Sequence, residues 1–141
     1  MGDISKDFSF SDFSRSEAAA AAKIENTIPA AVRPAIVALV ENVLQPLRDY
    51  GLPFKIVSGY RCAKLNEQIG GAKSSPHLKG EAVDIRSPFY VPVDMARWIK
   101  MLKVPFDQMT IHAGYVHLSY KKSGLNREKI TYDARYGGEK I

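Results

Sequence analysis

The sequence predicts an α+β fold, a single domain in which helices pack on a small, mainly antiparallel sheet. The chain has 141 residues, which is the usual size of one domain. Its apolar residues recur with helical and with strand spacing in the order α, β, α, β, α, β, β. Hydrophobic residues make up 45% and charged residues 25%, and this balance is typical of a globular protein.

The first part of the chain, about residues 1–52, is predicted to be helical. Ser14 or Ser16 is expected to cap a short helix over the alanine run, because a serine oxygen accepts from the free N–H groups of a first turn. A longer amphipathic helix is expected from about Ala31 to Tyr50, with a glycine behind it as a stop. Pro46 is expected to kink its last turn.

The second part, about residues 53–141, carries the predicted sheet and the candidate site residues described below. Strands are expected at 54–58, in GEAVDIR at 80–86 and at 129–132, and short helices at 63–69 and 95–102. The stretch MTIHAGYVHLSY predicts a β-hairpin that turns at Ala113–Gly114. No internal repeat or linker interrupts this order, so one domain is expected.

Charge and cysteine content restrict the possible partners. The net charge of +5 favours anionic partners such as nucleic acid, an acidic membrane surface or a cell-wall polymer. The basic residues form no stripe and no recognition motif appears, so nucleic acid is not expected. No segment approaches 18 consecutive apolar residues, so no membrane span is expected. The single Cys62 excludes an internal disulfide, and we expect a monomer.

The three histidines lie in two short segments. His77 belongs to SSPHLKGEAVDI, seven residues before Asp84, and His112 and His117 belong to the predicted hairpin. Two imidazoles and one carboxylate form the ligand set of a catalytic zinc site that leaves a fourth position open. The His-Glu-x-x-His helix is absent, so a zinc site here would have another design. The alternative is that these side chains are solvated loop residues.

The predicted hairpin brings two of the histidines to one face. With the turn at Ala113–Gly114, Thr110 lies opposite His117 and His112 lies opposite Tyr115. The two histidines are then diagonal neighbours, with Cβ atoms about 7 Å apart. This spacing suits one imidazole on a metal ion and the other within reach of a water or a leaving amine.

Residues 75–84 carry the most specific pattern in the chain. They read Ser-Pro-His-Leu-Lys-Gly-Glu-Ala-Val-Asp and match the Ser-x-His-x-x-Gly-x-Ala-x-Asp signature of the zinc D-alanyl-D-alanine carboxypeptidases and of related phage peptidoglycan peptidases. Other blocks are similar to that family in the same order, namely FSFSDF, NVLQPLRDYGLPFKIVSGYR, LNEQIGGAKSS, PFDQMT and YVHLSY. The sequence therefore resembles the family over most of residues 8–120.

The resemblance implies a set of site residues. Zn²⁺ would be held by His77, Asp84 and His117. Arg61, in the SGYR block, would face the substrate and clamp a terminal carboxylate or stabilise the oxyanion; a surface salt bridge is the alternative. Ser75 would bind substrate or orient a ligand, or it would only cap its own loop.

The general acid and base is less directly indicated. Many relatives carry a Glu just upstream of the last ligand, whereas some use a His five residues before it, as His112 stands here. His112 is therefore predicted to move the proton. The alternatives are that Asp107 or another carboxylate does so, or that activity is weak. Cys62 lacks a nucleophile setting and is expected to be a small buried residue, while Gly80 is expected to allow a sharp turn.

The predicted function is that of a zinc metallopeptidase hydrolysing peptide bonds at D-alanine in peptidoglycan stem peptides, as a carboxypeptidase or endopeptidase encoded by a phage or mobile element. A basic surface fits an anionic wall polymer. The N-terminus shows no basic segment followed by a long apolar run, so synthesis in the cytoplasm with action at the cell wall is expected. The alternative is a cell-wall binding module with the same fold and little or no activity.

Overall fold

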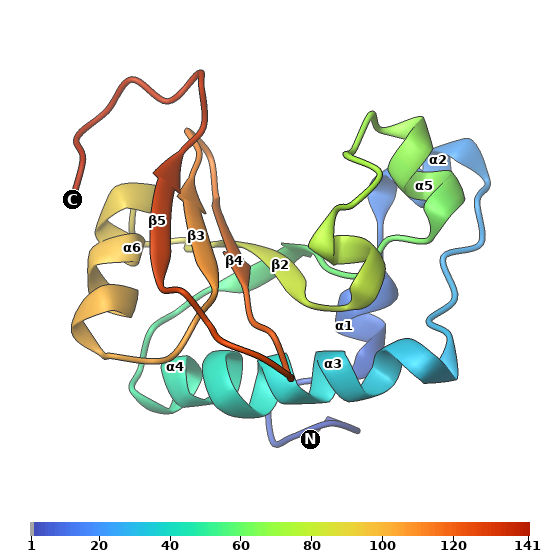
Figure 1. Ribbon diagram of the computed structural model, residues 1–141, viewed down its shortest axis with the longest axis horizontal. Helices are drawn as coiled ribbons and strands as arrows, with labels where there is room; N and C mark the ends of the chain where they lie inside the picture. Colours follow the sequence, from blue (N-terminus) through green and yellow to red (C-terminus); the bar gives the residue numbers. More distant parts are fainter. Residues whose placement is uncertain (1) are drawn as a thin grey trace.

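In the computed structural model, which describes residues 2–141, helices pack against a five-stranded sheet, and the α+β class is confirmed (Figure 1). The helical elements are α1 (Phe10–Ser14), α2 (Glu17–Ala22), the 3-10 turn η1 (Ala30–Val32), α3 (Arg33–Leu39), the π-helical turn η2 (Val40–Leu44), α4 (Gln45–Asp49), α5 (Ala63–Gln68), the 3-10 turn η3 (Pro76–Lys79) and α6 (Pro92–Met101). The strands are β1 (Lys55–Ser58), β2 (Ala82–Arg86), β3 (Gln108–Ile111), β4 (Val116–Ser119) and β5 (Lys129–Tyr132).

The strands follow the spatial order β1-β2-β4-β3-β5. Neighbouring strands are antiparallel except β3 and β5, which run parallel. The hairpin of β3 and β4 has the predicted register, because Thr110 lies opposite His117 and Ile111 opposite Val116. β5 covers the predicted residues, but the sequence did not indicate that it would pair in parallel with β3.

Alternation along the strands gives the sheet one buried face and one open face. Asp84 pairs with His117, His117 with Thr110, and Thr110 with Thr131, so these polar residues form one row across four strands. Neighbours along each strand point to the other face. They are fully buried apolar residues, namely Val83, Ile85, Met109, Ile111, Val116 and Leu118.

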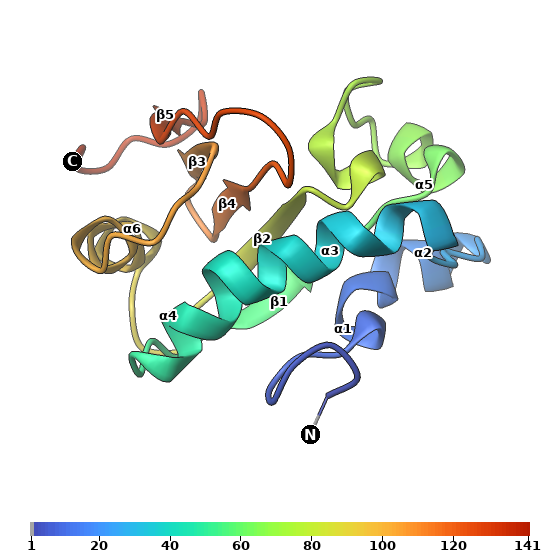
Figure 2. The same ribbon diagram turned by 60° about the horizontal axis from the view of Figure 1, so that its bottom comes forward.

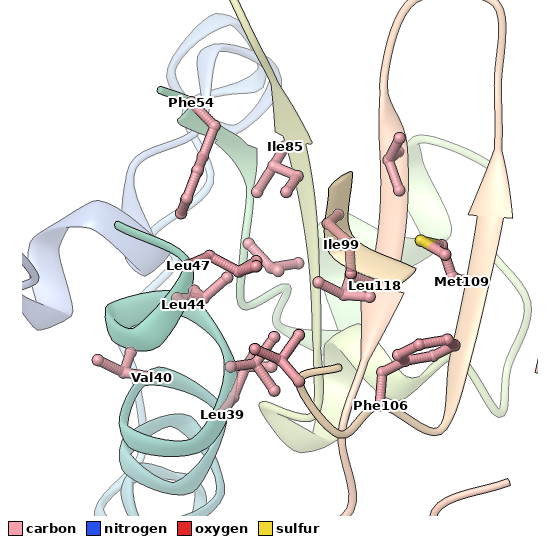
Figure 3. Close-up of a cluster of buried hydrophobic side chains, with 14 of the residues drawn as sticks. Leu39, Val40, Leu44, Leu47, Phe54, Ile85, Ile99, Phe106, Met109 and Leu118 are labelled. Atoms are coloured by element: carbon pink, nitrogen blue, oxygen red, sulfur yellow. The ribbon is translucent and has the colours of Figure 1, made fainter. Parts of the chain in front are cut away.

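The core lies between this buried face, the helical run 30–49 and α6 (Figure 3). Its most buried members are Ile36, Leu39, Leu44, Leu47, Ile85, Met95, Ile99, Met109, Ile111 and Leu118. Each such side chain contributes about 1.5–3 kcal/mol through its removal from water. Both predicted parts of the chain contribute to this one core, while the boundary between residues 52 and 53 stays a prediction.

The predicted helix at 31–50 is one continuous helical run that lies across β1 and β2 (Figure 2). It widens into a π-helical turn, in which the N–H of Gln45 bonds to the carbonyl of Val40. Pro46 follows at the start of α4. Since proline has no N–H to donate to the preceding turn, the wider turn accommodates it. The structure thus has a π-helical turn before the proline, and the expected kink in the last turn stays a prediction.

The same helical run meets a membrane-span test by length and composition. It has 20 residues, Ala30–Asp49, and a mean hydropathy of 1.2, and it is the one such helix among residues 2–141. Its fully buried side chains, including Ile36, Leu39, Val43 and Leu47, are part of the core described above. A core helix passes this test as readily as a membrane span does.

The short helices differ from the prediction in their boundaries. Ser16 caps α2, with its Oγ accepting from the N–H of Ala19 at 3.1 Å, as expected. α1 was not predicted, because five residues are too few to show a helical period. α6 begins at Pro92 rather than Met95, since proline is well tolerated in a first turn.

Gly80 is expected to be among the least replaceable glycines. Its φ is +72°, and a Cβ there would lie 2.6 Å from Val32 Cγ1 and 2.8 Å from Ile36 Cγ1. At Gly51, φ is +95° but nothing lies within 4 Å of the added Cβ. Thermal melts of Gly80→Ala should therefore show a loss of about 1–3 kcal/mol beyond that of Gly51→Ala. Equal losses would show that the helix moves aside without cost.

Candidate metal centre

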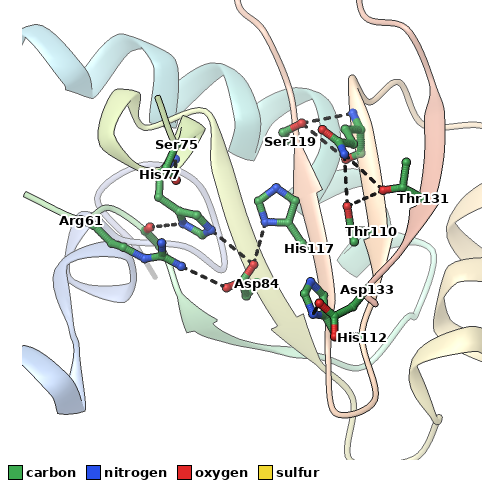
Figure 4. A network of polar contacts seen from close by, with 12 residues as sticks. Arg61, Ser75, His77, Asp84, Thr110, His112, His117, Ser119, Thr131 and Asp133 are labelled. Carbon is green, nitrogen blue, oxygen red and sulfur yellow. Dashed lines mark hydrogen bonds and ion pairs between the residues drawn. The ribbon is translucent and has the colours of Figure 1, made fainter. Parts of the chain in front are cut away.

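Three elements bring His77, Asp84 and His117 together on the open face of the sheet (Figure 4). His77 comes from η3, Asp84 from β2 and His117 from β4, where it lies directly opposite Asp84. Their candidate ligand atoms all lie within 4.8 Å of one another, and no other group of this kind occurs among the described residues. The ligand roles that the resemblance implies stay predictions, but the geometry that they require is present.

The imidazole of His77 is held with one nitrogen free. Its Nδ1 lies 2.7 Å from the carbonyl oxygen of Gly59, which can only accept, so the proton is on Nδ1. The Nε2 atom is buried without a hydrogen-bond partner in the described chain and faces Asp84 Oδ1 at 3.4 Å. A buried lone pair of this kind is costly unless it binds something. A carbonyl behind the other nitrogen is the usual support of a histidine that ligates a metal.

The Asp84 carboxylate joins the two histidines. Its Oδ1 lies 2.9 Å from Nδ1 of His117, and the ring centroids of His77 and His117 are 5.1 Å apart. Burial by itself raises the pKa of Asp84, but the hydrogen bond from His117 and the nearby His77 imidazole outweigh it, so the pKa lies below its ordinary value. Asp84 is therefore an anion at neutral pH. An anionic oxygen next to a free imidazole nitrogen fits a divalent cation such as zinc.

Arg61 lies against this cluster and not on a free surface. Its Nη2 is 3.6 Å from Asp84 Oδ2, and its side chain is 15% exposed. Its backbone N–H donates to the carbonyl of His77 at 3.2 Å. Burial lowers the pKa of Arg61, and the charge of Asp84 partly restores it. The surface salt bridge considered for Arg61 is thus replaced by a half-buried contact with a candidate ligand.

His112 lies in the next row of the same face, between an aromatic ring and a carboxylate. Its ring stacks on Tyr115 with centroids 4.2 Å apart, and the backbone N–H of His112 donates to the Tyr115 carbonyl, as the predicted pairing requires. On the other side, Nδ1 is 3.6 Å from Asp133 Oδ1. Burial lowers the pKa of His112, against the opposing charges of Asp133 and Asp84. His112 is therefore mostly neutral near pH 7 and able to accept a proton.

A comparison of the sequence with protein families agrees with this geometry. The sequence model of the peptidase M15 family matches residues 6–119, which include the cluster of His77, Asp84 and His117, together with Arg61 and His112. The chain belongs to the peptidase M15 family. The resemblance found in the sequence is thereby confirmed, and the chain is a metallopeptidase whose cluster of His77, Asp84 and His117 could hold the metal. No curated protein matches the chain.

Asp133 lies beside the candidate base His112 of this M15 peptidase, and the sequence did not reveal this contact. It follows β5, and its backbone N–H donates to the carbonyl of Ile111 at 2.9 Å, which continues the parallel pairing with β3. That pairing sets Asp133 beside His112. The residue lies beyond the range matched by the family, in a tail whose strand pattern gave no hint of its partner.

Two asparagines that position Arg61 were also missed. Asn26 is buried and donates from Nδ2 to the carbonyl of Tyr60 at 2.8 Å, while its Oδ1 accepts from the Cys62 N–H at 2.8 Å. Asn66 accepts from Arg61 Nη1 at 3.2 Å. A buried Asn with its bonds satisfied fixes the loop around it. No local sequence signal marks either residue, because Asn26 bonds to backbone groups more than 30 residues away and the Asn66–Arg61 contact depends on the fold of the loop between them.

The structure also bears on the remaining candidates. Asp107 is bound by Arg127 through both carboxylate oxygens, at 2.9–3.1 Å, so it is not available as the general base.

Ser75 accepts from the His77 N–H at 3.3 Å, which is the loop-capping role; its contact with substrate stays a prediction. The thiol of Cys62 accepts from the Leu65 N–H and caps α5, which fits a structural residue.

A cavity of about 550 Å³ opens beside the His77–Asp84–His117 cluster of the M15 peptidase. It is lined by β1, the loop from Gly59 to Arg61, α5 and the segment before α2, and it includes Asp84 and Tyr115. Figure 1 shows α2 and α5 side by side. The volume is sufficient for several residues of a peptide.

Proposed function

We propose that this M15 metallopeptidase uses zinc to hydrolyse peptide bonds at D-alanine in the stem peptides of bacterial peptidoglycan. The observation that carries the proposal is the buried, partnerless Nε2 of His77 facing ionised Asp84, with Arg61 against the same carboxylate. A candidate cation site and a guanidinium group that could bind a substrate carboxylate therefore lie next to each other. A substrate with a free C-terminal carboxylate near its scissile bond suits such a pair.

The proposed roles start with binding. His77, Asp84 and His117 would hold the zinc ion, which supplies a Lewis acid that polarises the carbonyl and activates water. The Nη2 group of Arg61 lies on the Asp84 side of the cluster and can donate to the terminal carboxylate or to the developing oxyanion. Burial of the guanidinium strengthens either contact, because less water competes with it.

The remaining residues handle the proton. A neutral His112 would take a proton from the attacking water and return it to the leaving amine. Asp133 beside Nδ1 favours the tautomer that leaves Nε2 free, and Tyr115 holds the plane of the ring. This arrangement, with a carboxylate behind the imidazole, supports activity rather than a binding module that has lost its base.

Asp133→Asn is expected to lower kcat by about tenfold and to shift its pH dependence. The negative charge of Asp133 raises the pKa of His112, so its removal leaves that pKa lower. Because the base must be neutral, activity rises with pH through the pKa of His112. The acid limb of the pH–rate profile should therefore move to lower pH in the variant.

Arg135→Gln is the matched control for this change. Arg135 Nε lies 3.5 Å from Asp133 Oδ2, and the side chain is 91% exposed. The charge of Arg135 lowers the pKa of His112, whereas that of Asp133 raises it. Because Arg135 is solvated, its removal should leave kcat within about twofold. An acid limb that stays in place in Asp133→Asn would show that Asp133 does not act on the base.

The proposed function is tested by mass spectrometry of two substrates treated with the protein. Purified peptidoglycan and a pentapeptide ending in D-Ala-D-Ala are incubated with zinc and, separately, with a chelator. Products that form only with zinc support the peptidase, and the mass released distinguishes free D-alanine from a cut cross-link. Intact substrates in the presence of bound zinc would favour the cell-wall binding module.

Action at the bacterial cell wall is part of the same proposal. The net charge of +5 supports it, because the wall carries anionic polymers. Sedimentation of the protein with purified walls at low and high salt measures this attraction, which should weaken as salt screens the charges.

A further inference from the structure

Along the strands, the open face of the sheet continues beyond the row that holds Asp84, His117 and Thr110. Ile85 pairs with Val116, and the next residues, Arg86 and Tyr115, both line the 550 Å³ cavity. On the outer side of β2, Lys55 pairs directly with Arg86 and lines the same cavity. The row that holds His112 and Tyr115 therefore ends in two adjacent basic side chains.

The pairing of Lys55 with Arg86 is unfavourable by itself. Like charges directly opposite each other on neighbouring strands destabilise a sheet. Both side chains are exposed. Neither forms an ion pair or a hydrogen bond with any part of the chain that the structure describes. An anion between the two side chains would relieve their repulsion.

The charge of the whole cavity points the same way. Its lining includes four cations, Arg15, Lys55, Arg61 and Arg86, and two carboxylates, Glu17 and Asp84. Asp84 is already engaged by His77, His117 and Arg61. Arg15 pairs with Asp12 outside the cavity. Even when Glu17 is counted against one of them, Lys55 and Arg86 leave the cavity with an excess of positive charge.

We propose that Lys55 and Arg86 form a subsite for a side-chain carboxylate of the substrate peptide. The inference rests on the proposed function. Arg86 lies two residues beyond Asp84 on β2, about 7 Å along the strand. An extended peptide covers that distance in about two residues. When the last D-alanine is the leaving group, the first residue before the scissile bond is the other D-alanine. The side-chain carboxylate that Lys55 and Arg86 would bind then belongs to the second residue before that bond.

Two stem pentapeptides test the subsite. Both end in D-Ala-D-Ala, and their third residue is either diaminopimelate or lysine, which differ by one carboxylate at the end of the side chain. The zinc-loaded protein should prefer the diaminopimelate peptide by about fivefold in KM, with similar kcat. The double variant Lys55→Gln/Arg86→Gln should lose this preference and cleave the lysine peptide as the wild type does.

Lys100→Gln/Lys103→Gln is the matched control, because it also removes two charges, here from exposed positions at the end of α6 and just after it, outside the cavity. It should keep the preference. In the wild type, salt raised from 0.05 to 0.5 M should reduce the preference by screening. A preference that is absent from the wild type, or unchanged in the double variant, would overturn the proposal.

Calorimetric titration separates this proposal from the proposed function. The two tripeptides that lack D-Ala-D-Ala are titrated into the zinc-loaded wild type and the double variant. Tighter binding of the diaminopimelate tripeptide by the wild type alone supports the subsite even when no pentapeptide is cleaved, in which case only the proposed function fails. Equal binding of both tripeptides to the wild type overturns the subsite.

Discussion

Replacing Asp84 with asparagine is expected to reduce metal-dependent hydrolysis by more than about 100-fold. Asparagine keeps the shape of the side chain and its ability to accept from His117 Nδ1, but it loses the anionic oxygen that faces His77 Nε2. Two neutral imidazoles bind a divalent cation much more weakly than the set that includes a carboxylate. The loss should therefore appear in metal affinity before it appears in the chemistry.

Thermal melts with and without zinc measure that affinity. A ligand that binds only the folded state stabilises it by about 2.7 kcal/mol at 100 times its Kd. The wild type should show this stabilisation, and Asp84→Asn should not. Asp94→Asn, on α6 and outside the cavity, should behave as the wild type does. Equal stabilisation by zinc in Asp84→Asn would remove Asp84 from the ligand set.

His112→Gln is expected to lower kcat by about 10²–10⁴-fold while the bound zinc stays at one per chain. Glutamine can keep a polar contact with Asp133 but cannot take up a proton at neutral pH. KM should change little, since His112 stacks on Tyr115 and the proposed contact with the substrate carboxylate comes from Arg61. Steady-state kinetics with metal analysis of each sample separates these effects.

Asp107→Asn is the comparison that decides between the two candidate bases. Asp107 is 4% exposed and holds Arg127, so its replacement should lower the melting temperature. The rate per folded, zinc-loaded molecule should nevertheless remain close to that of the wild type. Retention of kcat within threefold in His112→Gln, combined with its loss in Asp107→Asn, would reverse the assignment.

Much of the sheet could be predicted because its information is local. The period-2 alternation in MTIHAGYVHLSY and the Ala113–Gly114 turn fix which residues of β3 and β4 face each other, and the structure has that register. The signature at 75–84 identified His77 and Asp84 as candidate ligands, and the order of the similar blocks identified His117. These parts depend on a resemblance and on short-range geometry.

The helical part was predicted less completely. The apolar period at 31–50 showed the long helix, and Pro46 marked a disturbance, but only the packed helix showed that the disturbance is a π-helical turn. α1 was missed because its stability comes from contacts of buried Phe13 and from the pairing of Ser9 N–H with Asp12. A five-residue pattern cannot outweigh other local conformations by itself.

The sequence by itself determined the fold class, the hairpin register and the identity of the candidate ligands. Only the tertiary structure showed that the β3–β5 pairing sets Asp133 beside His112, that Asn66 bonds to Arg61, and that Lys55 faces Arg86. The physical reason is that a strand pattern specifies which side chains share a face but not which strand will pair with it. Partner choice is decided by the packing of the whole sheet against its core.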